Sequence, residues 1–222
     1  MKKYQKEFAE FLIDERALQF GRFELKSGRI SPYFFNTSAF NSGNTVEKLG
    51  YFYAEAILRH LPQCTSVFGP AYKGIPLCLS SAIALTHLSK KDIGYFFDRK
   101  EKKAHGDQGL LVGKIPLETE VIALVDDVIT DGQTKIEAIE NLKNWFGLSI
   151  SAVFVAFDRL EKNDEGIQAS QAFSEKTGIP VHAIITIYDV LSLLKEDSFK
   201  DTDQVPESSV EEIESYLKVY SN

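Results

Sequence analysis

Strand-like and helix-like segments alternate along most of this sequence, and that alternation limits the folds open to the chain. The clearest strand is the apolar run at residues 121–125, which is followed by a helical pattern at residues 133–146. A short continuous apolar run is typical of a strand that is buried on both faces of a sheet. Further strand patterns lie at residues 66–68, 93–97, 150–157 and 181–187. The alternation predicts an α/β fold with a mainly parallel central sheet flanked by helices.

The two ends of the chain differ from this repeating middle. Residues 4–16 carry apolar side chains at helical spacing. The stretch at residues 196–222 is acidic and polar, with one amphipathic piece at residues 210–219. For a chain of 222 residues we expect a single domain, residues 1–222. Residues 1–45 include an N-terminal addition to it, and the acidic C-terminal stretch is expected to be an appendage or docking helix without a chemical role.

The composition excludes several classes of function. The formal net charge of −7 is the opposite of what a general nucleic-acid binder carries. The most apolar helical stretch, residues 74–88, is interrupted by polar residues and is too short to span a bilayer. The N-terminal residues mix charges with apolar side chains, unlike a signal peptide. Cys64 and Cys78 form no metal or redox motif. We therefore expect a soluble, cytoplasmic protein without nucleic-acid or membrane partners.

One short stretch runs against the acidic composition. Arg99, Lys100, Lys102 and Lys103 lie within five residues, and Glu101 is the only acid among them. Positive charge concentrated in one loop of an acidic protein indicates a segment that meets an anion. A solvated charge run has the same composition, so this stretch alone does not decide between the two roles.

The clearest strand runs directly into two acids, Asp126 and Asp127, and then into a loop rich in threonine and glycine. In an open parallel sheet, ligands collect at the carboxyl ends of the strands. A loop that enters a helix offers unpaired N–H groups and the positive end of the helix dipole. Gly132 would let the backbone approach an anion, and Thr130 and Thr134 would add hydroxyl donors. This pattern favours a phosphate monoester, with the carboxylates holding ribose hydroxyls or Mg²⁺-bound water.

Other interpretations of the same loop remain open at this point. Thr130, Asp131 and Thr134 could be helix-capping residues of an ordinary strand–turn–helix junction. Paired acids at a strand end also occur in receiver-like signalling domains. The loop has neither the Gly-Lys pattern of a P-loop nor the G-x-G-x-x-G pattern of dinucleotide-binding proteins, which removes those two classes.

The segment VIALVDDVITDGQT, residues 121–134, resembles the signature of the type I phosphoribosyltransferases. In that family the motif binds the ribose 5-phosphate of phosphoribosyl diphosphate (PRPP). The resemblance implies PRPP contacts from Asp126, Asp127, Val128, Ile129, Thr130, Asp131, Gly132, Gln133 and Thr134. Asp131 departs from the small neutral residue that is usual in the orotate enzymes of the family. Its carboxylate would repel a phosphate unless it points outward, although the helix dipole compensates in part.

A segment near the N-terminus narrows the resemblance to the orotate phosphoribosyltransferases. FELKSGRISPYFFN, residues 23–36, is similar to the hood of that family. It implies that Lys26 faces the reaction centre and the donor, and that Phe34 and Phe35 line the pyrimidine pocket. An aromatic wall suits a flat heterocycle, while core packing is the alternative role for such a pair.

Two further segments resemble the parts of that family that handle the diphosphate. FGPAYKGIP, residues 68–76, resembles its diphosphate-binding loop, which implies donor contacts from Tyr72 and Lys73. DRKEKKAHGDQG, residues 98–109, resembles its mobile catalytic loop. The second resemblance implies donor contacts from Arg99, Lys100, Lys103 and His105. In the family this loop closes over the site of the neighbouring subunit, which implies a homodimer.

The last matching segment is FDRLE, residues 157–161, which follows a predicted strand. Arg159 would pair with the carboxylate of orotate, because a guanidinium matches a carboxylate bidentately. A surface salt bridge is the alternative role for this arginine. The resemblance also implies that Thr130 contacts the orotate.

Taken in order, the five segments cover roughly the first 195 residues and imply transfer of a phosphoribosyl group from PRPP to orotate. The implied catalytic residues are Lys26, Lys103, His105, Asp126 and Asp127. The implied cofactor is Mg²⁺, carried by PRPP and water rather than by protein side chains. Two alternatives remain: a phosphoribosyltransferase for another base, and a non-catalytic regulator that binds PRPP.

Overall fold

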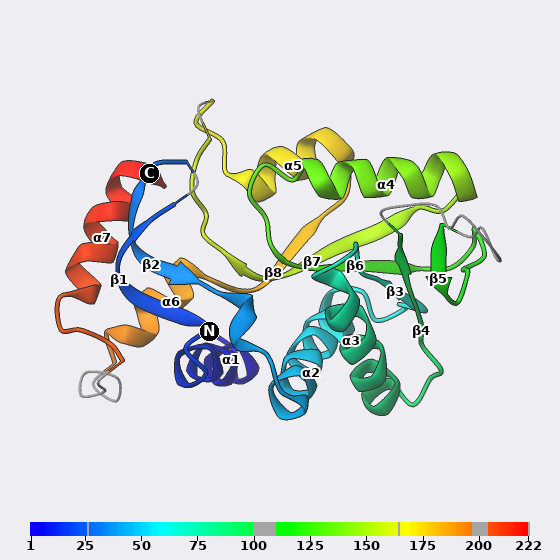
Figure 1. The fold of residues 1–222 in the computed structure, drawn as a ribbon, viewed down its shortest axis with the longest axis horizontal. Coiled ribbons are helices and arrows are strands. Elements are labelled where there is room, and N and C mark those ends of the chain that lie inside the picture. The colour runs from blue at the N-terminus through cyan, green and yellow to red at the C-terminus, as the bar shows by residue number, and fades with distance from the viewer. Residues whose placement is uncertain (26, 100–109, 164, 197–203, 222) are drawn as a thin grey trace.

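A six-stranded sheet forms the centre of the computed structural model, which describes residues 1–25, 27–99, 110–163, 165–196 and 204–221. The strands lie in the order β5-β4-β3-β6-β7-β8 (Figure 1). Their bounds are β3 Ser66–Phe68, β4 Gly94–Asp98, β5 Leu111–Gly113, β6 Ile122–Val128, β7 Ile150–Asp158 and β8 Val181–Thr186. Neighbouring strands pair in parallel, except that β5 is antiparallel to β4. The predicted fold class is confirmed.

The chain reverses its direction of travel across the sheet between β3 and β6. From β3 it passes through helix α3, Gly74–Ser89, to β4 on one side. From β6 it passes through helix α4, Gln133–Phe146, to β7 on the other side. Loops that leave two neighbouring parallel strands in opposite directions open a crevice at the carboxyl ends of those strands. The fold therefore places its natural ligand-binding position between the β3 and β6 loops.

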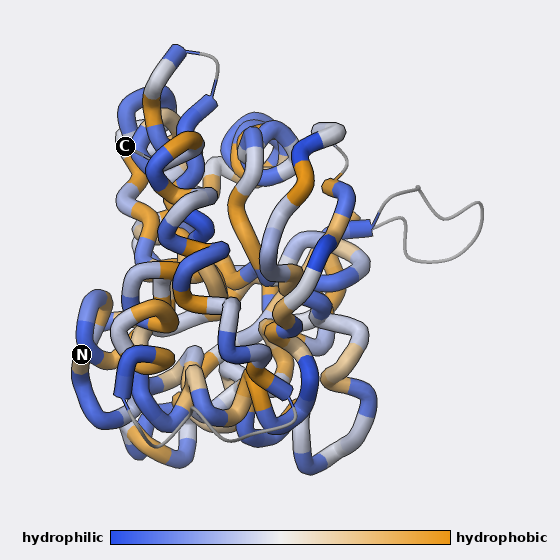
Figure 2. Tube along the Cα trace, turned by 90° about the vertical axis from the view of Figure 1, so that its left-hand side faces the viewer, coloured by the Kyte–Doolittle hydropathy of each residue, from blue (hydrophilic) through white to orange (hydrophobic). Residues whose placement is uncertain are grey.

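Helices cover both faces of the sheet (Figure 1). On one face lie α4 and α5, Ala169–Thr177, which bury an apolar cluster that includes Ile136, Leu142 and Phe173. On the other face lie α1, Lys3–Asp14, α2, Gly43–His60, and α3. Hydrophobic and hydrophilic stretches alternate along much of the chain (Figure 2), as expected where one side of a helix packs on a sheet.

The N-terminal addition is a separate two-stranded antiparallel sheet. It consists of β1, Leu18–Glu24, and β2, Ile30–Phe35, and the short 3₁₀ helix η1, Thr37–Ala39, follows it. After β8 the chain forms α6, Ile187–Leu194, and, past the stretch that the structure leaves undescribed, α7, Ser209–Tyr220. Helix α7 packs against β2, where the Tyr216 and Tyr33 rings meet edge to face at 5.9 Å. The predicted amphipathic piece near the C-terminus is thus a helix that docks on the chain's own N-terminal sheet.

Two details of the elements differ from the sequence prediction. Strand β6 extends to Val128, so that Asp126 and Asp127 lie within the strand instead of after it. The parallel pairing with β7 carries through the acids, since Asp126 pairs with Val155 and Val128 with Phe157. Strand β5 was not predicted, because three residues leave no periodicity to detect. Within the described part of the chain, no helix is long and apolar enough to cross a membrane.

A pair of histidines joins the end of α2 to β8. The rings of His60 and His182 stack with centroids 4.3 Å apart, and Phe154 lies 5.3 Å from His182 on the sheet. Burial lowers the pKa of both imidazoles. The neighbouring charges of Lys2 and Arg59 lower the pKa of His60 further, and His60 itself lowers that of His182. Both imidazoles therefore favour the neutral form more than a free histidine side chain does.

This pair predicts an acid-sensitive contribution to stability. A depressed folded-state pKa means that the unfolded chain binds protons first, so stability falls as pH drops from about 6.5 through the folded-state values. His182→Phe keeps the ring stack but removes one titrating group. We expect its thermal midpoint to fall less than that of the wild type between about pH 7 and about pH 5, measured by circular dichroism.

The control is His87→Asn, which removes an exposed histidine from α3. It should keep the wild-type pH dependence. A His182→Phe variant with the same acid sensitivity as the wild type would show that the stacked pair makes no such contribution.

Candidate active site

The loop after β3 is held in a tight conformation on one side of the crevice. A Cβ atom added to Gly69 would lie 2.0 Å from the carbonyl oxygen of Gly74, so the two ends of this loop approach each other as only glycines allow. The Ala71 N–H donates to Asp98 Oδ1 at the end of β4, at 2.6 Å. Tyr72, which follows a cis peptide bond after Ala71, is 72% exposed. The loop thus presents Tyr72 to solvent at the carboxyl end of β3.

The double aspartate lies on the other side of the crevice, with a lysine on each carboxylate. Lys135 Nζ from α4 forms an ion pair with Asp126, and it also donates to the Val128 carbonyl oxygen at 2.7 Å. Lys73 Nζ, from the end of the β3 loop, lies 2.8 Å from Asp127 Oδ2. Thr37 Oγ1 donates to the same Asp127 oxygen at 3.1 Å. Four parts of the chain therefore meet at these two carboxylates.

The two acids have unequal proton affinities. Burial raises the pKa of Asp126, with repulsion from Asp127 adding to it, and the ion pair with Lys135 offsets this only in part. Burial also acts to raise the pKa of Asp127, but the hydrogen bond and charge of Lys73 outweigh it and lower the pKa of Asp127 below its ordinary value. Asp127 is therefore the more strongly ionised carboxylate of the pair.

The predicted phosphate loop, residues 128–134, leads into the N-terminus of α4. Gly132 has a φ of +71° there, and an added Cβ would lie 2.7 Å from the Phe173 ring. Glycine at this position is thus required by the backbone conformation and by packing against α5. Of the other residues, Ile129 is buried in the core, while Thr130, Gln133 and Thr134 are exposed.

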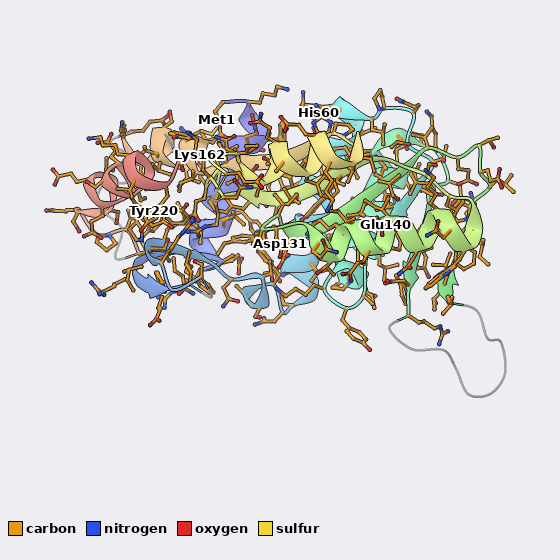
Figure 3. All side chains as sticks on the ribbon, turned by 90° about the horizontal axis from the view of Figure 1, so that it is seen from above. Met1, His60, Asp131, Glu140, Lys162 and Tyr220 are labelled. Atoms are coloured by element: carbon orange, nitrogen blue, oxygen red, sulfur yellow. The ribbon has the colours of Figure 1, made fainter. Side chains whose placement is uncertain are left out.

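The Asp131 side chain is exposed and points outward, which is the orientation that reduces repulsion of a bound phosphate. It is exposed at the start of α4, where Figure 3 labels it. Its Oδ1 accepts a hydrogen bond from the Gln133 N–H at 3.1 Å, as a helix-capping carboxylate does. The same geometry also uses one of the backbone donors that a phosphate would otherwise contact.

Arg159 lies just past β7, where several groups fix its guanidinium. Its Nε donates to Glu161 Oε1 at 2.7 Å and its Nη2 donates to Ser31 Oγ at 2.8 Å. The guanidinium carbon lies 4.1 Å from the centre of the Tyr33 ring. Burial disfavours the charge, but the nearby Tyr33 and Glu161 outweigh that effect and raise the pKa of Arg159. Arg159 is therefore a charged, oriented group whose ion pair with Glu161 is largely buried, and not part of a surface salt bridge.

The two phenylalanines of the predicted pyrimidine pocket point in opposite directions. They are neighbours in β2, where successive side chains alternate between faces. Phe35 packs against Phe157 at the end of β7, with ring centroids 5.4 Å apart. Phe34 is 37% exposed and stacks on Phe23 at 5.5 Å. The sequence prediction placed both rings in one aromatic wall, but in the structure they do not form a continuous wall.

Part of the predicted site lies outside the described residues: Lys26, Lys100, Lys103 and His105. Arg99 is described, and it follows β4 at the carboxyl edge of the sheet. Its backbone N–H donates to the Leu110 carbonyl oxygen at 2.8 Å. The two ends of the predicted catalytic loop thus meet at the same edge as the double aspartate.

Sequence reasoning assigned no role to several residues that contact the site, among them Ser31 and Tyr33 beside Arg159. Lys135 and Thr37 bind the aspartates, and Glu161 and Tyr216 surround Arg159. Local sequence patterns could have pointed to two of them, because Lys135 occupies a buried position of α4 and Glu161 is an acid two residues after Arg159. Thr37 and Tyr216 had no such signal, because their partners are distant in the sequence.

A double aspartate lies at the crevice between the β3 and β6 loops, beside the predicted phosphate-binding loop, and a small N-terminal sheet is added to the core. This is the arrangement of a type I phosphoribosyltransferase. Comparison with known proteins carries this further, although no protein-family model matches the chain. The orotate phosphoribosyltransferase of Yersinia enterocolitica is 46% identical over 196 residues, which are 88% of this chain and 91% of that protein. The corresponding protein of Chromohalobacter salexigens is 42% identical over 227 residues, covering 99% and 96% of the two chains.

A solved structure agrees with these sequences. The crystal structure of the Francisella tularensis orotate phosphoribosyltransferase superposes with a TM-score of 0.82 and 34% identity, over 97% of this chain and 100% of that one. This chain belongs to the orotate phosphoribosyltransferase family, and it is an enzyme. The resemblance inferred from its sequence motifs is confirmed at the level of the family.

The burial of Lys135 leads to a prediction about stability. Its side chain is 7% exposed, and removing it would leave Asp126 buried without its partner. Lys135→Met should lower the free energy of unfolding by about 3 kcal/mol, measured by urea titration at neutral pH. Lys143→Met removes an exposed lysine from the same helix and should cost less than about 0.5 kcal/mol. Equal costs for the two variants would contradict the role of Lys135 in the aspartate pair.

Proposed function

We propose that this chain transfers the 5-phosphoribosyl group from PRPP to orotate, giving orotidine 5′-monophosphate and diphosphate, in the biosynthesis of pyrimidine nucleotides. The observation that carries this proposal is the 46% identity with a curated orotate phosphoribosyltransferase over nearly the whole of both chains. Relatives of that name at this level of identity do not favour the two alternatives, a transferase for another base and a non-catalytic regulator. In this proposal residues 1–222 act as one catalytic domain.

The donor would lie in the crevice between the β3 and β6 loops. The loop at residues 128–134 would hold the 5-phosphate at the N-terminus of α4, where the helix dipole favours an anion. Asp126 and Asp127 would accept hydrogen bonds from the ribose hydroxyls. Because the 5-phosphate is remote from the reacting bond, its contacts would contribute to catalysis by positioning the anomeric carbon.

The leaving diphosphate gains negative charge as the bond to the anomeric carbon breaks, and cations must stabilise it. Lys73 lies within reach of that charge, since its ammonium group already bridges from the β3 loop to Asp127. Its side chain is 70% exposed and can turn toward a diphosphate at little desolvation cost. We assign the same role to Arg99 and, from the family resemblance alone, to Lys100, Lys103 and His105.

The residues present suit a magnesium ion that arrives with the donor. Asp126 and Asp127 are the carboxylates at the crevice, and each is already paired with a lysine. Within the described ranges, no group of three or more His, Cys, Asp or Glu side chains could hold a metal by itself. In the proposed complex the aspartates would therefore bind Mg²⁺ through water. The ion would supply positive charge to the departing diphosphate.

Arg159 would bind the carboxylate of orotate through the Nη1 atom of its guanidinium. Glu161 takes the Nε and Nη2 atoms. Within the described part of the chain, Nη1 donates no hydrogen bond to a protein acceptor. The planar fork can therefore offer its Nη1 side to a second carboxylate.

Two further features of the proposal rest on the family resemblance. Closure of the loop at residues 98–109 over the neighbouring subunit would make the enzyme a homodimer with shared sites. The cytoplasmic location likewise remains a prediction from the sequence.

The decisive experiment is an absorbance assay of orotate consumption with purified protein, PRPP and Mg²⁺, run beside adenine, hypoxanthine, guanine and uracil. We expect orotate to be consumed only when both PRPP and metal are present, and the other bases to remain unchanged. Turnover of a different base would reject orotate as the substrate. Binding of PRPP without turnover of any base would favour the regulator.

Arg159→Lys tests the carboxylate assignment while keeping a positive charge beside Glu161. Loss of the planar fork should raise the KM for orotate about 10- to 100-fold, the equivalent of about 1.5–3 kcal/mol, because a charge-assisted hydrogen bond is lost. The KM for PRPP should stay within about twofold.

Arg59→Lys is the matched control, because Arg59 also pairs with a glutamate, Glu55 at 3.2 Å, and stacks over a tyrosine ring, that of Tyr4, but lies at the C-terminal end of α2. It should leave the KM for orotate unchanged. An equal rise of both Michaelis constants in Arg159→Lys would argue against a specific contact with orotate.

A further inference from the structure

The C-terminal helix α7 reaches the charged group that the proposed function assigns to orotate. The Tyr216 hydroxyl donates to Glu161 Oε1 at 2.8 Å, and Arg159 Nη2 lies 3.5 Å from the same hydroxyl oxygen. Burial raises the pKa of Tyr216 to about 12, so this hydroxyl keeps its proton and acts as a donor at neutral pH. A residue 57 positions further along the chain than Arg159 therefore takes part in its surroundings.

Helix α7 is fastened to the segment that carries Arg159. The Lys162 N–H donates to the Tyr220 carbonyl oxygen at 2.7 Å, and Figure 3 shows both residues at the α7 end of the molecule. The guanidinium of Arg29 lies 4.8 Å above the Tyr220 ring and 3.5 Å from Glu161 Oε2. Residues 159–162 and the last turns of α7 thus form one connected unit.

Glu161 needs to be held in place, because its carboxylate competes with the orotate carboxylate for the guanidinium of Arg159. It lies beside Arg159, where a second carboxylate is proposed to bind, and the two negative charges repel each other. Tyr216 and Tyr33 both donate to Glu161 Oε1, at 2.8 and 3.4 Å. These hydroxyls keep the carboxylate on the Nε side of the guanidinium. Without the shorter of the two hydrogen bonds, Glu161 could swing toward Nη1 and occupy the substrate's position.

We propose that α7 is part of the base-recognition apparatus, and that Tyr216 is a positioning residue that holds Glu161 so that Arg159 keeps one edge available for the carboxylate of orotate. This inference rests on the proposed function and extends it to the C-terminal helix. It assigns a task to a segment whose sequence carries no recognisable motif.

The test is Tyr216→Phe, which deletes the hydroxyl and keeps the ring that packs on Tyr33 and Tyr220. The KM for orotate should rise about three- to tenfold, as loss of one hydrogen bond implies. The kcat and the KM for PRPP should stay within about twofold of the wild type. Tyr188→Phe is the matched control, because it deletes an exposed tyrosine hydroxyl from α6, and it should leave all three constants unchanged.

A double-mutant cycle with Arg159→Lys separates positioning from a merely structural effect. If Tyr216 acts through Arg159, the double variant should have nearly the same KM for orotate as Arg159→Lys alone. Multiplying effects in the double variant would overturn the proposal, and so would an unchanged KM for orotate in Tyr216→Phe. A wild-type protein that does not consume orotate would instead refute the proposed function, so the two failures are distinguishable.

Discussion

Asp126 and Asp127 are consecutive residues at the end of β6, and the surrounding structure depends on the two lysines that neutralise them. Leaving one buried carboxylate without a partner costs several kcal/mol, which is a large part of the stability of an ordinary domain. Lys135 comes from α4, and Lys73 comes from the loop after β3. Those are the two segments that border the crevice. The ion pairs that make the acids tolerable therefore also fix the two proposed phosphate-binding loops relative to each other.

The two lysines differ in how firmly they are bound. Lys135 is 7% exposed and has a second acceptor in the Val128 carbonyl group, whereas Lys73 is 70% exposed. A buried ammonium cannot leave its partner without a large desolvation cost, but an exposed one can. In the proposed reaction Lys135 would remain on Asp126, while Lys73 would exchange Asp127 for the diphosphate. This would free Asp127, the more strongly ionised acid, for the ribose.

The sequence was informative wherever the signal was local. The helix predicted at residues 133–146 is α4 with the same bounds, because its apolar residues repeat at helical spacing and Gly132 and Gly147 flank it. The position of the double aspartate at the carboxyl end of a parallel strand could be predicted from one apolar run and the helix after it. The extension of β6 through the acids did not, since it depends on pairing with β7. The separation of Phe34 from Phe35 follows from strand alternation, and it could have been predicted from β2 alone.

The proposed orotate end of the site follows the same physical rule as the donor end. Arg159 is buried, and Glu161 compensates its charge as the lysines compensate the aspartates. A charged side chain that already has an ion-pair partner binds a ligand only with the donors that the partner does not use. The position of the partner therefore decides which donors are available to the ligand. Around Arg159 that direction is set by Ser31 and Tyr33 from the N-terminal sheet and by Tyr216 from the C-terminal helix. The N-terminal sheet and the C-terminal helix, which look like additions to a phosphoribosyltransferase core, thus converge on the arginine that is proposed to bind the carboxylate of orotate.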